Sequence, residues 1–210
     1  MNIDELEAAA RRAWPALEEV DSELGLLRFA AGVSRRANSL TPSPAGLHNH
    51  ARVQELAEYW FRSRGLAPVV RVVGTGQPEQ LALDRALDAA GYQRDALTAV
   101  LTRPLPKRQP DGIGRGQPVV TANWLQVWYQ LRGLAPEDLP VHQAMLERIT
   151  DSCCPLVINA GNATPVASAL GVLSNGLLGV FGVATAVHAR RQGLAASLVN
   201  QLCVWAAEQG

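Results

Sequence analysis

Apolar side chains recur along the chain in patterns typical of helices and of strands. In residues 48–64 they follow i, i+3, i+4, i+7 and i+8 spacing, and Gly65 marks the expected end of that helix. Further helices are expected at residues 3–13, 78–90, 121–132, 137–150 and 192–208. Apolar or β-branched runs predict strands at residues 23–31, 68–73, 96–101, 155–159, 165–173 and 177–187. Residues 34–39 are expected to form a polar turn or hairpin end.

Glycine and proline divide this pattern into parts. Gly161-Asn162 and Ser174-Asn175-Gly176 are hairpin turn sequences between the last three expected strands. Residues 104–118 hold four prolines and three glycines, a density that predicts a linker or a long surface loop.

Composition narrows the class of protein. The 210 residues are 48% hydrophobic, which is enough for a sizeable core, and 19 basic side chains balance 19 acidic ones. Nucleic-acid binders usually carry a basic excess, so we expect no nucleic-acid partner. No secretory leader and no apolar run of about 18 residues is visible, so we expect no membrane span and a cytoplasmic location. The three cysteines are expected to be reduced, partly buried thiols.

The candidate chemistry lies where the strand at 177–187 leads into the helix at 192–208. First-turn amides of a helix lack intrahelical acceptors and lie at the positive end of its dipole, so they bind anions. Gly193 and Ala195 leave room for a pyrophosphate, and Arg190 and Arg191 add charge. The alternative is a helix start that merely packs tightly on the sheet.

This segment resembles the acetyl-CoA signature of the GNAT superfamily of N-acetyltransferases, Gln/Arg-x-x-Gly-x-Gly/Ala. Arg190, Gly193 and Ala195 fill its fixed places. The resemblance implies acetyl-CoA as cosubstrate and transfer of acetyl to a primary amine. It also implies that backbone groups of Val183, Ala184 and Thr185 pair with pantetheine. The amides that would hold the diphosphate are those of Arg191, Gln192, Gly193, Leu194 and Ala195.

The fold implied is α+β, a mixed, largely antiparallel sheet flanked by helices, in two GNAT-like units. Residues 14–40 and 78–92 resemble a GNAT subgroup with a degenerate acyltransferase-like domain before the catalytic one. We therefore expect a degenerate N-terminal domain at residues 1–103, a linker at 104–118 and an acetyl-CoA-binding domain at 119–210. The N-terminal half lacks the signature loop and is assigned no coenzyme.

Catalytic residues stay unassigned. In the family a tyrosine on a helix after the next strand often protonates the thiolate, and none of Tyr59, Tyr92 and Tyr129 occupies that position. The sequence stops before that strand, so the resemblance implies that C-terminal elements are missing, and the alternative function is a non-catalytic coenzyme-binding or protein-interaction module. No carboxylate lies on the 177–187 strand. His188 is more plausible as a surface or phosphate-side residue than as the base.

Other polar and aromatic groups have two interpretations each. The polar residues of the expected turn could line a substrate cleft or simply satisfy backbone groups: Ser34, Arg35, Arg36, Asn38 and Ser39. His48 and His50 lack a third ligand, so no metal site is expected. Trp124 and Trp128 are expected in the core rather than as a stacking platform. A weaker rival is nucleic-acid binding through Lys107, Arg108 and Arg115.

The expected partners follow from these inferences. A small-molecule or peptide amine is the expected substrate. The 177–187 strand, if unpaired on one side, would recruit a second chain, so a homo-oligomer is expected. The alternative is that the N-terminal half covers that strand.

Overall fold

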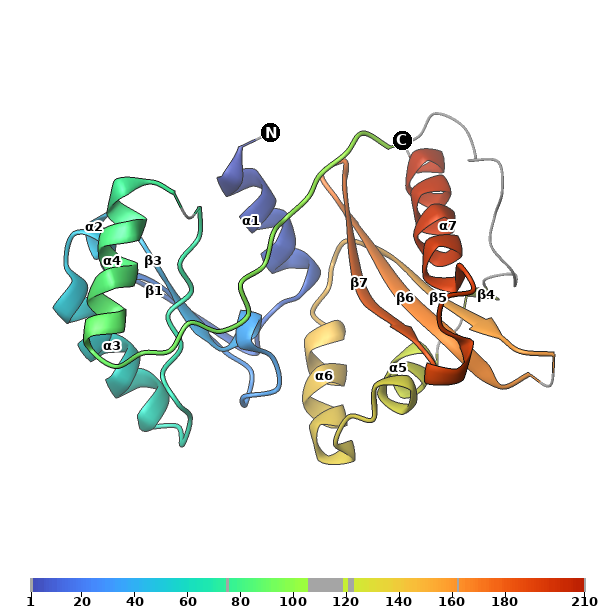
Figure 1. The fold of residues 1–210 in the computed structure, drawn as a ribbon, viewed down its shortest axis with the longest axis horizontal. Coiled ribbons are helices and arrows are strands. Elements are labelled where there is room, and N and C mark those ends of the chain that lie inside the picture. Colours follow the sequence, from blue (N-terminus) through green and yellow to red (C-terminus); the bar gives the residue numbers. More distant parts are fainter. Residues whose placement is uncertain (1, 75, 106–118, 121–122, 162, 210) are drawn as a thin grey trace. The chain divides into compact units, whose positions relative to one another are not determined.

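The computed structural model describes residues 2–74, 76–105, 119–120, 123–161 and 163–209. Two compact units are present, drawn in Figure 1. The N-terminal unit is Trp14–Leu101, and the C-terminal unit combines Met1–Ala13 with Thr102–Gly210. The N-terminal domain was expected to begin at residue 1, whereas residues 1–13 belong to the C-terminal unit. Most of the expected linker, residues 106–118, lies outside the described residues.

The C-terminal unit contains an antiparallel sheet in the order β4-β5-β6-β7. Its strands are β4 (Val119–Val120), β5 (Ser152–Asn159), β6 (Pro165–Ser174) and β7 (Leu177–Thr185). Asn175 and Gly176 join β6 to β7 with φ of 49° and 74°, as the predicted hairpin turn requires. The sheet carries β7 at one end of the described order.

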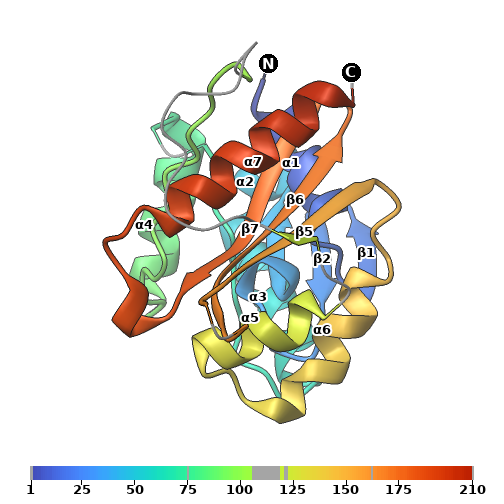
Figure 2. The same cartoon turned by 90° about the vertical axis from the view of Figure 1, so that its right-hand side faces the viewer.

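Helices cover both faces of this sheet (Figures 1 and 2). On one face lies α7 (Leu194–Glu208), whose Leu194, Leu198 and Leu202 pack into the core with β5 and β6. The i, i+4, i+8 spacing of these leucines places them on one side of the helix. On the other face lie α1 (Ile3–Ala13) and α5 (Trp124–Arg132), with η2 (Pro136–Asp138) and α6 (Leu139–Leu146) beside α5.

The first helix is fixed to the C-terminal unit by one arginine. Arg12 Nε donates to Ser174 Oγ at 2.8 Å and lies 3.4 Å from a carboxylate oxygen of Asp151. These contacts, together with packing against β6 and β7, explain why residues 1–13 belong to this unit rather than to the N-terminal one.

The N-terminal unit contains a second antiparallel sheet, β1-β2-β3, with helices packed on it. Its elements are β1 (Glu18–Ser22), β2 (Gly25–Phe29), η1 (Arg35–Ala37), β3 (Ser39–Pro42), α2 (Pro44–Leu47), α3 (His50–Arg62) and α4 (Pro78–Ala89). Leu27, Leu40, Phe61 and Leu83 form the centre of its core. The helices expected at 48–64 and 78–90 are confirmed.

The strand expected at residues 23–31 is confirmed with shorter bounds, as β2, because the chain turns before Gly25 and pairs β2 with β1. Two other strand predictions in this unit are wrong. Residues 68–73 form only a single parallel bridge, between Val70 and Leu40. Residues 96–101 pair with no described strand, and Leu97 and Leu101 are 94% and 89% exposed. A β-branched or apolar run predicts strand propensity, but a partner strand is needed to form a ladder.

The fold class is confirmed as α+β, with largely antiparallel sheets flanked by helices. No described helix has the length and apolar content to cross a membrane. That the N-terminal unit is a degenerate copy of the GNAT fold stays a prediction.

Candidate functional site

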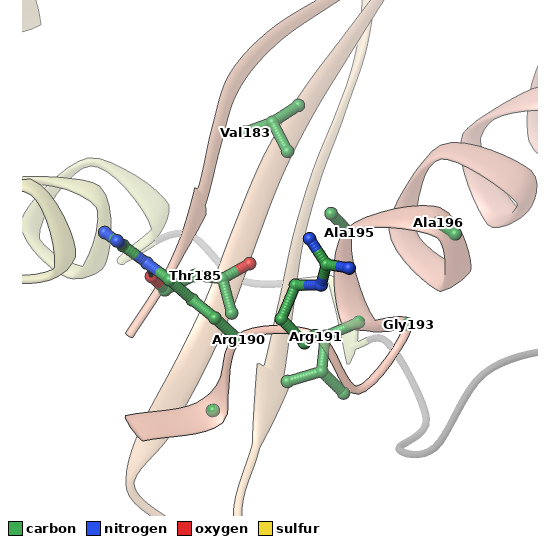
Figure 3. A pocket seen from close by; sticks show the side chains of 9 residues that line it. Val183, Thr185, Arg190, Arg191, Gly193, Ala195 and Ala196 are labelled. Atoms are coloured by element: carbon green, nitrogen blue, oxygen red, sulfur yellow. Dashed lines mark hydrogen bonds between the residues drawn. The ribbon is translucent and has the colours of Figure 1, made fainter. Parts of the chain in front are cut away.

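A hollow of about 440 Å³ opens where β7 ends and α7 begins (Figure 3). Its lining comes from the end of the strand, the connecting loop and the first turn of the helix: Val183, Thr185, Ala189, Arg190, Arg191, Gly193, Leu194, Ala195 and Ala196. Two of these residues are arginines and none is acidic, so the lining favours an anionic ligand.

The first turn of α7 presents free backbone donors to this hollow. Gly193 is the N-cap residue with φ of 79° and has no side chain that could cap the helix. The first intrahelical bond runs from the Ser197 amide to the Gly193 carbonyl, at 2.9 Å. Within the described part of the chain, the amides of Leu194, Ala195 and Ala196 have no acceptor. Unsatisfied amides and the helix dipole together favour an anion here.

The two arginines of the loop take different directions (Figure 3). Arg191 lies between β7 and the start of α7, beside Ala195. Arg190 extends away from α7, and its Nε donates to the Thr185 carbonyl at 3.4 Å. Arg191 also has φ of 63°, a left-handed conformation that costs a non-glycine residue roughly 1–2 kcal/mol. Such strain is often found where a loop is shaped for a ligand.

A β-bulge interrupts β7 just before the hollow. Ser168 of β6 pairs with Ala184, and Leu170 pairs with Phe181. One residue of β6 therefore lies opposite two residues of β7, Gly182 and Val183. Gly182 has φ of 55°, which glycine adopts without strain.

The bulge determines which side chains of β7 line the hollow. Leu178 and Val180 pack against the core beneath α7. Strict alternation would turn Val183 and Thr185 to the opposite face of the sheet. The extra residue of the bulge reverses the alternation, so these two side chains line the hollow at the start of α7.

Most of the predicted coenzyme-binding residues lie together. Val183, Thr185, Arg190, Arg191, Gly193, Leu194 and Ala195 all line the hollow. Ala184 is buried, and Gln192 is exposed on the loop, without contributing to the lining. Ala189 and Ala196 are lining residues that the sequence did not identify.

The remaining candidates lie elsewhere. His188 is exposed on η3 (Val187–Ala189) and does not line the hollow. His50 Nε2 lies 2.8 Å from the Leu47 carbonyl, and the described residues contain no group of three potential metal ligands. Cys154 and Cys203 are buried free thiols, whereas Cys153 is exposed. Lys107, Arg108 and Arg115 lie outside the described residues.

The polar turn of the N-terminal unit satisfies its own backbone. Asn38 Oδ1 accepts from the amides of Ala30 and Gly32, at 2.8 and 3.0 Å. Ser34 Oγ accepts from Trp14 Nε1 at 3.1 Å. Arg35 forms an ion pair with Asp95 at 2.7 Å, and Ser39 is fully buried. These contacts favour the structural interpretation of the turn.

Trp124, Trp128, Tyr129 and His142 form an aromatic cluster beside the bulge, and the contact of Tyr129 with His142 was not predicted from the sequence. Trp124 is 2% exposed, as its expected place in the core requires, and stacks on Trp128. Tyr129 Oη lies 2.6 Å from His142 Nδ1 in the same cluster. Burial raises the pKa of Tyr129 to about 12 and lowers the pKa of His142, which keeps both groups neutral. The spacing of Tyr129 and His142 gave no signal, because the α5–α6 turn brings them together.

The whole chain matches a known family. The model of the family described as "Probable histone acetyltransferase Rv0428c C-terminal" matches residues 1–210. "Uncharacterized N-acetyltransferase YobR" of Bacillus subtilis is 26% identical over 218 residues, which cover 100% of this chain and 85% of that protein. "Probable histone acetyltransferase Rv0428c" of Mycobacterium tuberculosis is 31% identical over 128 residues, covering 61% of this chain and 39% of that protein.

Two solved structures share the fold. A GCN5-related N-acetyltransferase from Kribbella flavida matches with a TM-score of 0.58 and 18% identity, covering 99% of this chain and 80% of that one. A functionally unknown conserved protein from Staphylococcus epidermidis matches with a TM-score of 0.55 and 10% identity, covering 100% of this chain and 83% of that one. At these identities the likeness concerns the fold alone.

Proposed function

Because the chain belongs to the GNAT superfamily, in the family described as "Probable histone acetyltransferase Rv0428c C-terminal", we propose that it transfers acetyl from acetyl-CoA to a primary amine. The acceptor is a small-molecule or peptide amine. We further propose a cytoplasmic location, no nucleic-acid partner and self-association.

The observation that carries the proposal is the free N-terminus of α7. The amides of residues 194–196 face a hollow whose described lining includes two arginines and no carboxylate. A diphosphate needs several donors and positive charge at one point, and this turn offers both. Arg191 stands beside these amides (Figure 3), so it would meet the same phosphate oxygens.

The strand end suits the other part of the coenzyme. Val183 and Thr185 line the hollow, and β7 pairs with β6 alone among the described strands, so backbone groups on its outer side would pair with pantetheine. In this arrangement the thioester lies near the bulge. A backbone N–H near Val183 would then stabilise the oxyanion that develops during acyl transfer.

Transfer also requires two proton movements. The attacking amine must lose its ammonium proton, and the departing thiolate must gain one. None of the described lining residues of the hollow is a carboxylate, histidine or tyrosine. The described lining of the hollow therefore supplies neither the base nor the acid, and the catalytic residues stay unassigned.

Two measurements test the proposal together. Calorimetry with CoA measures binding, and coenzyme A at about one hundred times its dissociation constant should add roughly 2.7 kcal/mol to the stability of the C-terminal unit. An acetylation assay then supplies acetyl-CoA with small amines and lysine-containing peptides in separate arms. Binding without transfer to any amine would favour a non-catalytic coenzyme-binding module. Absence of binding would contradict the proposal outright.

A further inference from the structure

The six-membered ring of Trp124 lies against the α-carbon of Gly182, at the bulge. A β-carbon at residue 182 would overlap ring atoms Cζ2 and Cη2 of Trp124 and lie 3.5 Å from Cδ1 of Trp128. The ring thus fills the space into which any side chain at residue 182 would project.

The neighbours of Trp124 hold this ring in place. Trp128 stacks on it with ring centroids 5.6 Å apart and planes inclined by 8°. Trp128 in turn presents its ring edge-on to Tyr129 and His142, with centroids 5.7 and 5.3 Å away. Because Tyr129 and His142 are joined by a hydrogen bond of 2.6 Å, the cluster is packed as one group.

The other side of the bulge is held by a hydrogen bond. The fully buried Ser168 donates from Oγ to the Gly182 carbonyl at 3.1 Å. Gly182 is therefore held at its carbonyl by β6 and at its α-carbon by α5.

No hydrogen bond of its own explains where the Trp124 ring lies. Trp124 Nε1 is buried and has no partner in the described part of the chain. A buried donor without an acceptor lowers stability. The position of the ring is thus set by its shape and packing, which act on Gly182.

We propose that Trp124 is a positioning residue for acetyl recognition. Its ring keeps the bulge at Gly182 and Val183, and the bulge turns Val183, Thr185 and the intervening backbone toward the hollow. The inference rests on the proposed function, in which a backbone N–H near Val183 meets the acetyl carbonyl. The phosphate end of the site, at Gly193 and α7, does not depend on Trp124.

Trp124→Phe tests this, because it keeps an aromatic side chain while withdrawing the ring atoms that touch Gly182. Calorimetry on the full chain compares acetyl-CoA with CoA. We expect wild type to bind acetyl-CoA about fivefold more tightly, the effect of one amide–carbonyl hydrogen bond. In Trp124→Phe this preference should fall to near one, while the affinity for CoA changes less than twofold. A general loss of stability would not remove the preference in the protein that remains folded.

The matched control is Trp205→Phe, the same change in a half-buried tryptophan of α7 that packs against the core. It should keep the fivefold preference. Gly182→Ala disturbs the same contact by adding a methyl group on the strand side. It should lose the preference for acetyl-CoA over CoA, as Trp124→Phe does. This variant answers the question if Trp124→Phe does not fold.

Hydrogen exchange without nucleotide separates this inference from the proposed function. We expect the amides of residues 182–185 to exchange at least tenfold faster in Trp124→Phe than in wild type. A Trp124→Phe protein that binds CoA and keeps the wild-type preference would overturn the inference and leave the proposed function standing. If wild type binds neither nucleotide, the proposed function fails and acetyl recognition with it. Unchanged exchange in Trp124→Phe would then also overturn the positioning of the bulge.

Discussion

Trp124 of α5 lies directly against Gly182 of β7, with no room between them for a β-carbon. The contact occurs where the pairing of β6 and β7 shifts register, so a helix on one face of the sheet shapes the strand that leads to the hollow on the other. Residue 182 must therefore be small, and its φ of 55° also favours glycine.

Gly182→Ala should therefore destabilise the C-terminal unit by about 2–4 kcal/mol, through overlap with Trp124 and backbone strain. Urea unfolding measures the loss. Gly133→Ala is the control, because Gly133 has φ of 62° but no atom within 4 Å of an added β-carbon. It should lose only the strain contribution, about 1–2 kcal/mol. An equal loss of stability in the two variants would show that the indole ring of Trp124 moves aside without lowering the free energy of unfolding.

The anion site makes a separate prediction about binding. Gly193→Val should weaken the affinity for CoA at least tenfold, or about 1.4 kcal/mol. Gly193 caps α7 with φ of 79°, which a β-branched residue resists, so the first-turn amides would be displaced. Calorimetry checks this against Gly133→Val, which carries similar strain at the end of α5, away from the hollow. Unchanged affinity in Gly193→Val would contradict the assignment of the loop.

The sequence predicted what depends on local chemistry. The loop and helix at residues 190–208 follow from glycine, arginine and the spacing of leucines, and the structure contains them. The bulge could not be predicted from the sequence, because the conformation at Gly182 depends on contact with Trp124, which is distant in the sequence. The strand at 18–22 was missed because EEVDS is largely exposed and shows no apolar alternation. In contrast, residues 96–101 have strand-like composition but no partner in the described chain.

Arg191 allows charge and strain to be separated. Arg191→Gly should weaken CoA binding severalfold, because a donor to phosphate is lost. Its melting temperature should nevertheless not fall. Relief of the left-handed strain at φ of 63° offsets the greater flexibility that glycine gives the unfolded chain. Arg191→Ala, which loses the charge but keeps the strain, is the comparison. Calorimetry and thermal unfolding check both quantities, and a marked drop in melting temperature for Arg191→Gly would refute the argument.

The neutral pair of Tyr129 and His142 limits stability at both ends of the pH range. Burial lowers the pKa of His142. Below about pH 6.5 the unfolded chain therefore takes up a proton that the folded chain does not, and the stability decreases as the pH is lowered. Burial raises the pKa of Tyr129 to about 12. From about pH 10 upward the unfolded chain loses a proton that the folded chain keeps, so stability falls as pH rises, by up to roughly 2–3 kcal/mol.

Urea unfolding across pH 5–11 measures both effects. Tyr129→Phe should abolish the part of the alkaline fall that Tyr129 causes, and Tyr59→Phe, a change in an exposed tyrosine, should not. An identical alkaline fall in wild type and Tyr129→Phe would show that the buried hydroxyl does not titrate as inferred.

The outer side of β7 makes the last prediction. Among the described residues β7 pairs with β6 alone, and its sequence, LLGVFGVAT, is uncharged and only partly buried. Unpaired strands of this kind attract another strand unless a charge or a covering element prevents it. We therefore expect the chain to associate with a second copy through β7, and light scattering over a concentration series should show a rising mass.

Leu177→Lys places a charge at the start of β7 and should reduce that association. Leu81→Lys introduces the same charge on α4 of the N-terminal unit, at a leucine that is 38% exposed, and should leave association unchanged. The positive charge added is equal in the two variants, so a difference between them locates the contact on the strand rather than in the overall charge. A protein that stays monomeric at every concentration would show that another part of the chain already covers this edge.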